Sequence, residues 1–294
     1  MTPVRPLADR GLFLCGLIAH RDRVRDHSAG QRLNYFAHAI RFLEEDPYFL
    51  AGTAVPDWMA VADRPVRVRA KLAQQLIDST SDPVTRSVAR GALRHLEDDD
   101  WFHATAAFVE VSSDLARRFR AFLGPDHPAQ CGFLGHIVTE LLIDSELDRR
   151  HPGLLQTYYQ QLDQIDPLIV EAAVNQMARG ETARLRVFIP LFRVHRFLFD
   201  YAEDHRLLAR LNGVMHRVKL EPLPANLLGE LATARGIVRD RIAELLPPEH
   251  FGGLSSDITE ERPPPGFATS NARQTGGGRM ASIAELQTRR QASD

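Results

Sequence analysis

The chain has 294 residues, of which 44% are hydrophobic and 25% are charged. These fractions are typical of a folded globular protein and exclude a wholly disordered or collagen-like chain. The 36 Lys and Arg residues nearly balance the 38 Asp and Glu residues, which removes the electrostatic argument for a nucleic acid or an anionic membrane as the main partner. Two cysteines are too few for a disulfide framework, so a reducing compartment is favoured.

The first 32 residues are rich in arginine and weakly patterned, and we expect them to form an extension before the folded domain. Their longest apolar run, residues 11–19, is shorter than the roughly 18 residues of a membrane-spanning helix. Charged residues follow this run, where a signal peptide would have a cleavage site with small residues. The sequence therefore predicts a cytoplasmic protein without a membrane span.

Residues 33–246 carry nearly all the apolar periodicity, and its spacing is that of helices. Hairpin turn signals and an internal repeat of fixed period are missing from the sequence. We therefore predict an all-α fold, a single helical-bundle domain. Helices are expected around 36–43, 84–96, 102–123, 133–150, 153–163, 167–179, 184–202, 204–217 and 225–246.

From Pro247 onward the chain is rich in proline and glycine and poor in apolar residues. Such a segment cannot bury enough surface to offset the entropy lost on ordering, so residues 247–294 are predicted to be a disordered tail. The predicted organisation is an extension over 1–32, an all-α domain over 33–246 and this tail.

Polar clusters interrupt the apolar pattern. The segment Asn34-Tyr-Phe-Ala-His38 places a histidine at the start of an apolar helix, and a small-residue stretch places Asp57 between a proline and a tryptophan. Farther on, His95, Asp99 and His103 recur at intervals of four residues, which aligns them on one face of a helix.

A second polar stripe has the same spacing and consists of His136, Glu140 and Asp144. Two such stripes facing each other inside a bundle, with His38 and Asp57 added, would make a site of imidazoles and carboxylates. This ligand set suits Mn²⁺, Fe or Zn²⁺.

Each residue also has a structural interpretation that stays open at this point. His38 could be a hydrogen-bonded core residue, and Asp57 could cap a helix. The acidic run 97–100 could be a solvated face, and Glu140 and Asp144 could pair with arginines. Apolar neighbours favour burial of these last two, and buried carboxylates are costly unless they are paired or metal-bound.

In this order, the clusters resemble the motifs of the acyl carrier protein phosphodiesterase family. Asn34-Tyr-Phe-Ala-His38 is similar to the family's Asn-Phe-Leu-Ala-His, and Gly52-Thr-Ala-Val-Pro-Asp57-Trp58 to its Gly-Asn-Leu-Leu-Ala-Asp-Phe. Gly91-Ala-Leu-Arg-His95-Leu-Glu-Asp-Asp99 is similar to Gly-Ile-x-x-His-x-x-x-Asp, and Leu211-Asn-Gly-Val-Met-His-Arg217 to Leu-Asn-Gly-Met-Ala-x-Arg. The resemblance covers about residues 33–220, in four short blocks.

The resemblance implies an all-α hydrolase that depends on a divalent metal, with a site distantly like that of HD-type phosphohydrolases. The implied reaction releases 4′-phosphopantetheine from acyl carrier protein. Two departures stand out: His103 occupies a position where the family has Asp, and His136 lacks the Asp that precedes it in the family. A looser similarity connects the spaced histidines with zinc-dependent phospholipase C.

We therefore predict a divalent-metal-dependent phosphodiester hydrolase, with acyl carrier protein as a candidate partner. The alternative is a non-catalytic helical scaffold or protein-binding module in which these residues are structural. Arg94 is a candidate for gripping phosphate, and Asp144 for orienting a ligand imidazole. The predicted metal ligands are His38, Asp57, His95, Asp99 and His136, and the predicted proton-transfer groups or further ligands are His103 and Glu140.

Overall fold

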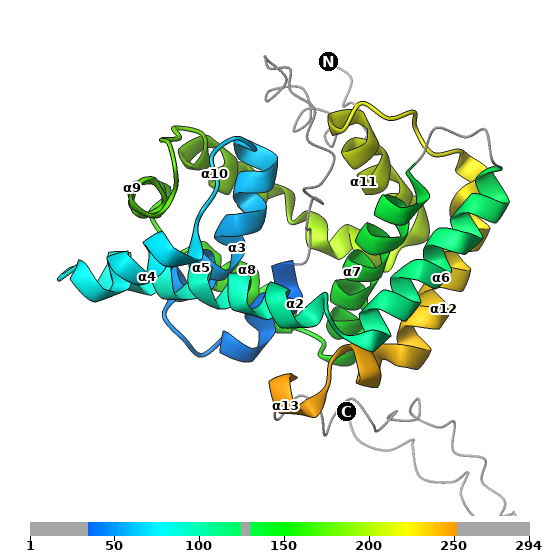
Figure 1. Ribbon diagram of the computed structural model, residues 1–294, viewed down its shortest axis with the longest axis horizontal. Coiled ribbons are helices and arrows are strands. Elements are labelled where there is room, and N and C mark those ends of the chain that lie inside the picture. The colour runs from blue at the N-terminus through cyan, green and yellow to red at the C-terminus, as the bar shows by residue number, and fades with distance from the viewer. Residues whose placement is uncertain (1–34, 125–129, 252–294) are drawn as a thin grey trace, which may run out of the picture. The chain divides into compact units, whose positions relative to one another are not determined.

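The computed structural model describes residues 35–124 and 130–251 (Figure 1). They belong to one compact unit, residues 1–260, and the second unit, residues 261–294, holds none of them. The predicted extension over 1–32 and the predicted tail beyond residue 251 lie outside the described residues. None of the described helices has the length and apolar character needed to cross a membrane.

Helices form nearly all of the described structure, which confirms the predicted all-α class. No strand occurs within these residues, although Val68 and Ala178 form an isolated antiparallel bridge. The α-helices are α2 (Tyr35–Ala39), α3 (Pro47–Ala62), α4 (Ala70–Ser79), α5 (Pro83–Phe102), α6 (Ala106–Leu123), α7 (Cys131–Arg150), α8 (Leu154–Leu162), α9 (Pro167–Met177), α10 (Leu185–His195), α11 (Asp204–Arg217), α12 (Leu228–Leu245) and α13 (Pro248–Phe251). Short 3-10 helices are η2 (Ile40–Phe42), η3 (Phe197–Ala202) and η4 (Ala225–Leu227).

The structure adds α3 and α4 to the predicted helices, divides the helix expected over 36–43 into α2 and η2, and differs at further places. The helix expected over 184–202 ends at His195, because Arg196 adopts a left-handed backbone with φ of 44° and a 3-10 helix follows. The helix expected from residue 102 begins only at Ala106, where the hydroxyl of Thr105 accepts from the Phe108 N–H and caps its start. Residues 248–251, expected to be disordered, form the short helix α13.

Helices α3 and α5 cross in direct backbone contact. Asp82 caps the start of α5, and Pro83 occupies its first turn. A Cβ atom on Gly52 would lie 2.3 Å from the Val88 carbonyl oxygen, and one on Gly91 only 2.1 Å from that of Phe49. Glycine is therefore required at both positions, and the crossing brings Asp57 of α3 near His95 of α5.

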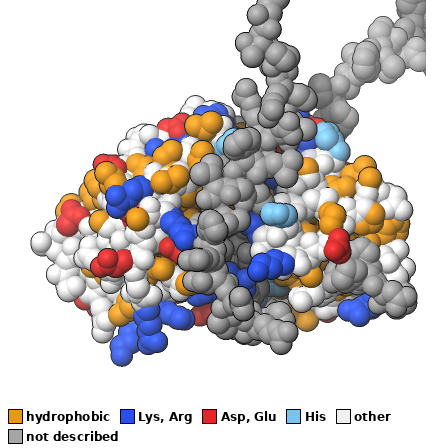
Figure 2. Space-filling view, turned by 90° about the horizontal axis from the view of Figure 1, so that it is seen from above, with side chains coloured by type: hydrophobic (Ala, Val, Ile, Leu, Met, Phe, Trp, Pro, Cys, Tyr) orange, Lys and Arg blue, Asp and Glu red, His pale blue; other side chains and the backbone are white. Residues whose placement is uncertain are grey.

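A similar contact joins α6 and α7, which lie side by side with α12 (Figure 1). A Cβ atom on Gly135 of α7 would lie 2.3 Å from the Ser112 carbonyl oxygen of α6. This close approach fixes the segment of α7 that carries His136 and Glu140. On the face seen in Figure 2, acidic, basic and apolar side chains are interspersed, in keeping with the balanced charge of the chain.

Helix α2 contacts both α3 and α7. The buried carboxylate of Asp144 on α7 accepts hydrogen bonds from the backbone N–H groups of Tyr35, Phe36 and Ala37, at 3.1, 3.0 and 2.8 Å. These three donors begin a helix and have no acceptor within it. Asp144 therefore fixes α2, and with it His38, against α7.

Candidate metal centre

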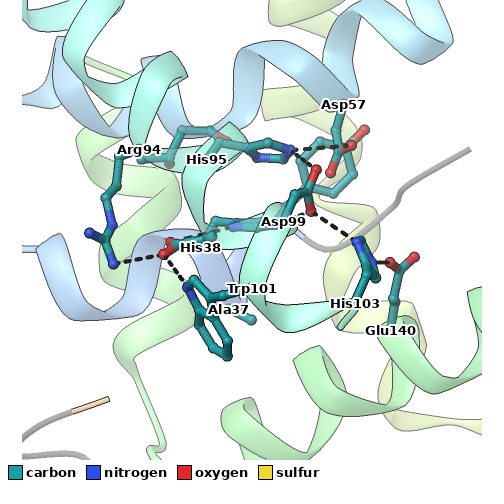
Figure 3. A network of polar contacts seen from close by, with 12 residues as sticks. Ala37, His38, Asp57, Arg94, His95, Asp99, Trp101, His103 and Glu140 are labelled. Carbon is teal, nitrogen blue, oxygen red and sulfur yellow. Dashed lines mark hydrogen bonds and ion pairs between the residues drawn. The ribbon is translucent and has the colours of Figure 1, made fainter. Parts of the chain in front are cut away.

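Three residues from two helices form what we call the buried group: His38, His95 and Asp99 (Figure 3). Their donor atoms lie within 4.8 Å of one another, and all three residues are buried. One carboxylate oxygen of Asp99 lies 3.6 Å from His38 Nε2, and the other lies 3.3 Å from His95 Nε2. The two imidazole rings are stacked, with centroids 3.9 Å apart.

The environment of His95 fixes how its ring is protonated. Its Nδ1 lies 2.7 Å from the Thr53 carbonyl oxygen, which can only accept, so Nδ1 carries the proton. Burial and the charge of His38 lower the pKa of His95, which favours the neutral ring. Its Nε2 is buried without a hydrogen bond of good geometry. The Nε2 lone pair therefore points toward carboxylates.

This arrangement matches what a divalent cation requires. His95 Nε2 faces Asp99 at 3.3 Å and Asp57 at 3.9 Å, and a lone pair between two carboxylates is unfavourable unless positive charge lies among them. Ligand atoms about 2.1 Å from one ion are at most about 4.2 Å apart. The separations of His95 Nε2 from Asp99 and Asp57 and of His38 Nε2 from Asp99 are within that limit. Hydrogen bonding of the distal imidazole nitrogen to a carbonyl is typical of metal-binding histidines.

A second set, the half-exposed group, consists of His103, His136 and Glu140. One oxygen of Glu140 lies 2.8 Å from His103 Nε2 and 3.1 Å from His136 Nε2. The Glu140 side chain is 1% exposed, whereas those of His103 and His136 are 17% and 30% exposed. Although burial opposes ionisation, hydrogen bonds from the two histidines lower the pKa of Glu140 to about 2.

Asp99 joins the two groups. The oxygen that lies 3.6 Å from His38 Nε2 also lies 3.8 Å from His103 Nδ1 (Figure 3). The charges of the neighbouring imidazoles outweigh the effect of burial and hold the pKa of Asp99 far below its usual range. The two predicted stripes are thus brought together, as two adjacent groups that share one carboxylate.

Asp98 is a buried member of the same network that sequence reasoning missed. Its carboxylate pairs with Arg41 and with Arg94, the latter at 2.7 Å, and accepts from Trp101 Nε1 at 3.2 Å. It also lies 3.6 Å from His38 Nδ1. Burial disfavours a charged His38, but Asp98 and Asp99 outweigh that effect and raise the pKa of His38 to about 10.

Two predicted residues have different neighbours from those expected. Arg94, the candidate for phosphate, binds Asp98, and its side chain is 33% exposed. Asp144 accepts hydrogen bonds from the backbone of α2 and so supports His38 through that helix, while its predicted role in orienting a ligand imidazole stays a prediction. Burial raises the pKa of Asp144 to about 7.

Comparison of the chain with family models, curated proteins and solved structures finds no match. The fold and the site therefore define an all-α protein with two adjacent groups of residues that could hold metal ions. The resemblance to acyl carrier protein phosphodiesterases stays a prediction from the motifs.

Proposed function

We propose that this protein is a divalent-metal-dependent hydrolase of phosphodiesters. The observation that carries the proposal is the His95 Nε2 atom, buried, bare of hydrogen bonds and directed at two carboxylates. A structural histidine would use both nitrogens in hydrogen bonds, because buried polar atoms are normally satisfied. The motif resemblance supports the phosphodiester as the substrate class.

The buried group would hold one ion through His38, His95 and Asp99, with Asp57 beside it. When bound, a divalent ion lowers the pKa of a water molecule and screens the charge of a phosphodiester. The Thr53 carbonyl keeps the proton on His95 Nδ1 and so keeps Nε2 available as a ligand. Asp99 extends toward His103, so a second ion in the half-exposed group would share this carboxylate.

His103 and Glu140 are suited to proton transfer. The 2.8 Å separation of His103 Nε2 and Glu140 Oε1 allows a proton to pass between them. His103 is partly exposed, so its ring can exchange protons with solvent, whereas Glu140 is buried and ionised. His136 Nε2, 3.1 Å from the same oxygen, keeps that carboxylate in place.

The test measures metal content and hydrolysis on the same preparation. The full chain is stripped with a chelator, loaded with Mn²⁺, Fe²⁺ or Zn²⁺, and assayed with bis(p-nitrophenyl) phosphate and with acyl carrier protein carrying 4′-phosphopantetheine. We expect one or two ions per chain and metal-dependent hydrolysis. His95→Ala should lose both properties, and His195→Ala on α10 is the matched control. A metal-free protein that added ions do not change would support the scaffold interpretation.

A further inference from the structure

The ring of His250 in α13 lies flat on the indole of Trp101. Their centroids are 3.7 Å apart and the planes differ by 5°. The backbone carbonyl of His250 also accepts a hydrogen bond from Arg41 Nη1 at 2.7 Å. The indole face of Trp101 is therefore a stacking surface, and Arg41 holds the backbone of the residue that covers it.

This stacking surface borders the buried group. Trp101 Nε1 and Arg41 both bind Asp98, whose carboxylate lies 3.6 Å from His38 Nδ1. A cavity lies here, and Figure 3 shows Trp101 next to His38. Its lining comprises Ala37, His38, Arg41, Asp98, Trp101, Phe102, Leu246 and Phe251. A ring on Trp101 would thus be continuous with a group bound near His38.

In the segment that covers Trp101, Phe251 is buried in the core, whereas His250 is only partly buried. Helix α13 is a single turn, and its regular backbone bonds are those from the N–H groups of His250 and Phe251 to the Pro247 carbonyl oxygen, at 3.0 and 3.1 Å. An isolated turn has little stability of its own, so its position depends on the contacts of His250 and Phe251. The partly buried His250 side chain can rotate off the indole while Phe251 stays in the core.

We propose that the Trp101 face binds a planar aromatic ring carried by the phosphodiester, and that His250 occupies this place when substrate is absent. The inference rests on the proposed function, and it specifies the substrate class as a diester with an aromatic ester group. His250 shows which chemistry fits: a flat ring that lies parallel to the indole. Stacking of this kind accepts different flat rings, because it depends on the π face alone.

The first experiment compares two substrates with the same leaving group, bis(p-nitrophenyl) phosphate and methyl p-nitrophenyl phosphate, on the metal-loaded full chain. They differ only in the group that stays on phosphorus, an aromatic ring or a methyl. We expect KM to be about tenfold lower for the aromatic diester, in line with ring stacking on one aromatic side chain. Trp101→Leu should bring the ratio of the two KM values close to one.

His250→Ala tests the same surface without touching Trp101. Removing the competing imidazole should increase the preference for the aromatic diester severalfold. Glu249→Ala is the matched control, because Glu249 is an exposed residue of the same helix turn. It should leave the ratio of the two KM values as in the wild type.

A second readout does not depend on activity. Diphenyl phosphate should shift the NMR resonance of the Trp101 indole N–H and not that of Trp58, which is buried in α3 and serves as an internal reference. Dimethyl phosphate should shift neither. Hydrolysis without ring preference, with no shift at Trp101, would overturn the ring site and leave the proposed function standing. A shift at Trp101 without any hydrolysis would support the ring site and overturn the proposed function.

Discussion

The buried group and the half-exposed group use the same residue types in opposite surroundings. In the buried group a histidine nitrogen has no hydrogen bond, and carboxylates surround two stacked imidazoles. In the half-exposed group one carboxylate is hydrogen-bonded to two imidazoles that solvent can reach. In the first arrangement His38 is the counter-ion of Asp98 and Asp99, and the His95 nitrogen still faces two carboxylates, whereas in the second arrangement the carboxylate is satisfied by two imidazoles. If the proposed function holds, we expect an ion to bind at the buried group and protons to exchange at the half-exposed group.

The largest effect is expected from Asp99, because it belongs to the buried group and also lies beside His103 of the half-exposed group. Asp99→Ala should remove bound metal and reduce kcat/KM by more than about 100-fold, since loss of residues that merely orient ligands costs 10–100-fold. Asp100→Ala, at an exposed position of the same helix, is the control. Metal analysis and hydrolysis rates check this. Equal losses in both variants would show that the acidic run acts only as diffuse charge.

Asp144→Ala should distinguish the two groups, because its effect reaches the buried group through α2. It leaves the first N–H groups of α2 without their acceptor, so the free energy of unfolding should fall by about 2 kcal/mol, as measured by urea denaturation. Mn²⁺ affinity should fall about tenfold, because α2 carries His38. Ser145→Ala is the matched control, since Ser145 lies on α7 next to Asp144 but accepts a hydrogen bond from Arg235 of α12. Unchanged affinity in Asp144→Ala would show that α2 keeps its position without this cap.

The two groups should lose their stabilising effect at opposite ends of the pH range in chelator-treated protein. The pKa of Glu140 is lowered from 4.5 to about 2, so its contribution is fully present above pH 4.5 and is lost as the pH falls toward 2. The pKa of His38 is raised from 6.5 to about 10, so its contribution is present below pH 6.5 and is lost as the pH rises toward 10.

Unfolding free energies across the pH range check this, with each group removed in turn. The loss of unfolding free energy in Glu140→Gln relative to the wild type should become smaller at acid pH. The corresponding loss in His38→Gln should become smaller at alkaline pH. Parallel deficits at all pH values would show that neither charge contributes to stability.

Arg94 should have the smallest effect. Its ion pair with Asp98 is one-third exposed on the arginine side, and such pairs contribute less than about 1 kcal/mol. Arg41 still neutralises Asp98 in Arg94→Ala. We therefore expect a change in unfolding free energy below about 1 kcal/mol. A rise in KM in the same variant would confirm the phosphate contact predicted from the sequence, and an unchanged KM would refute it.

Local patterns predicted most of the helices, because apolar spacing and proline or aspartate at helix starts depend on neighbours in sequence. The break after His195 was missed, since no glycine marks Arg196, the residue with a left-handed backbone. Such a turn is rare for residues other than glycine, and only tertiary packing selects it here.

The candidate site shows the same difference between contacts that are local in sequence and contacts that depend on tertiary packing. Spacing of four residues identified the partners that share a helix, such as His95 with Asp99 and His136 with Glu140. Contacts between distant segments were missed: Asp98 meets Arg41 across 57 positions, and Asp144 meets α2 across more than 100. The spacing of four residues between Arg94 and Asp98 was a local signal that Asp98 has a charged partner.

The glycine contact between α3 and α5 has a consequence for selectivity among ions. Gly52 and Gly91 set how far Asp57 stands from His95, although neither residue has an atom that could bind a metal. Any ion held there must suit a spacing fixed by two residues without side chains. A single methyl group added at either position would force α3 and α5 apart and so change the separation of Asp57 and His95, which places the control of that spacing about one helical turn away from both side chains.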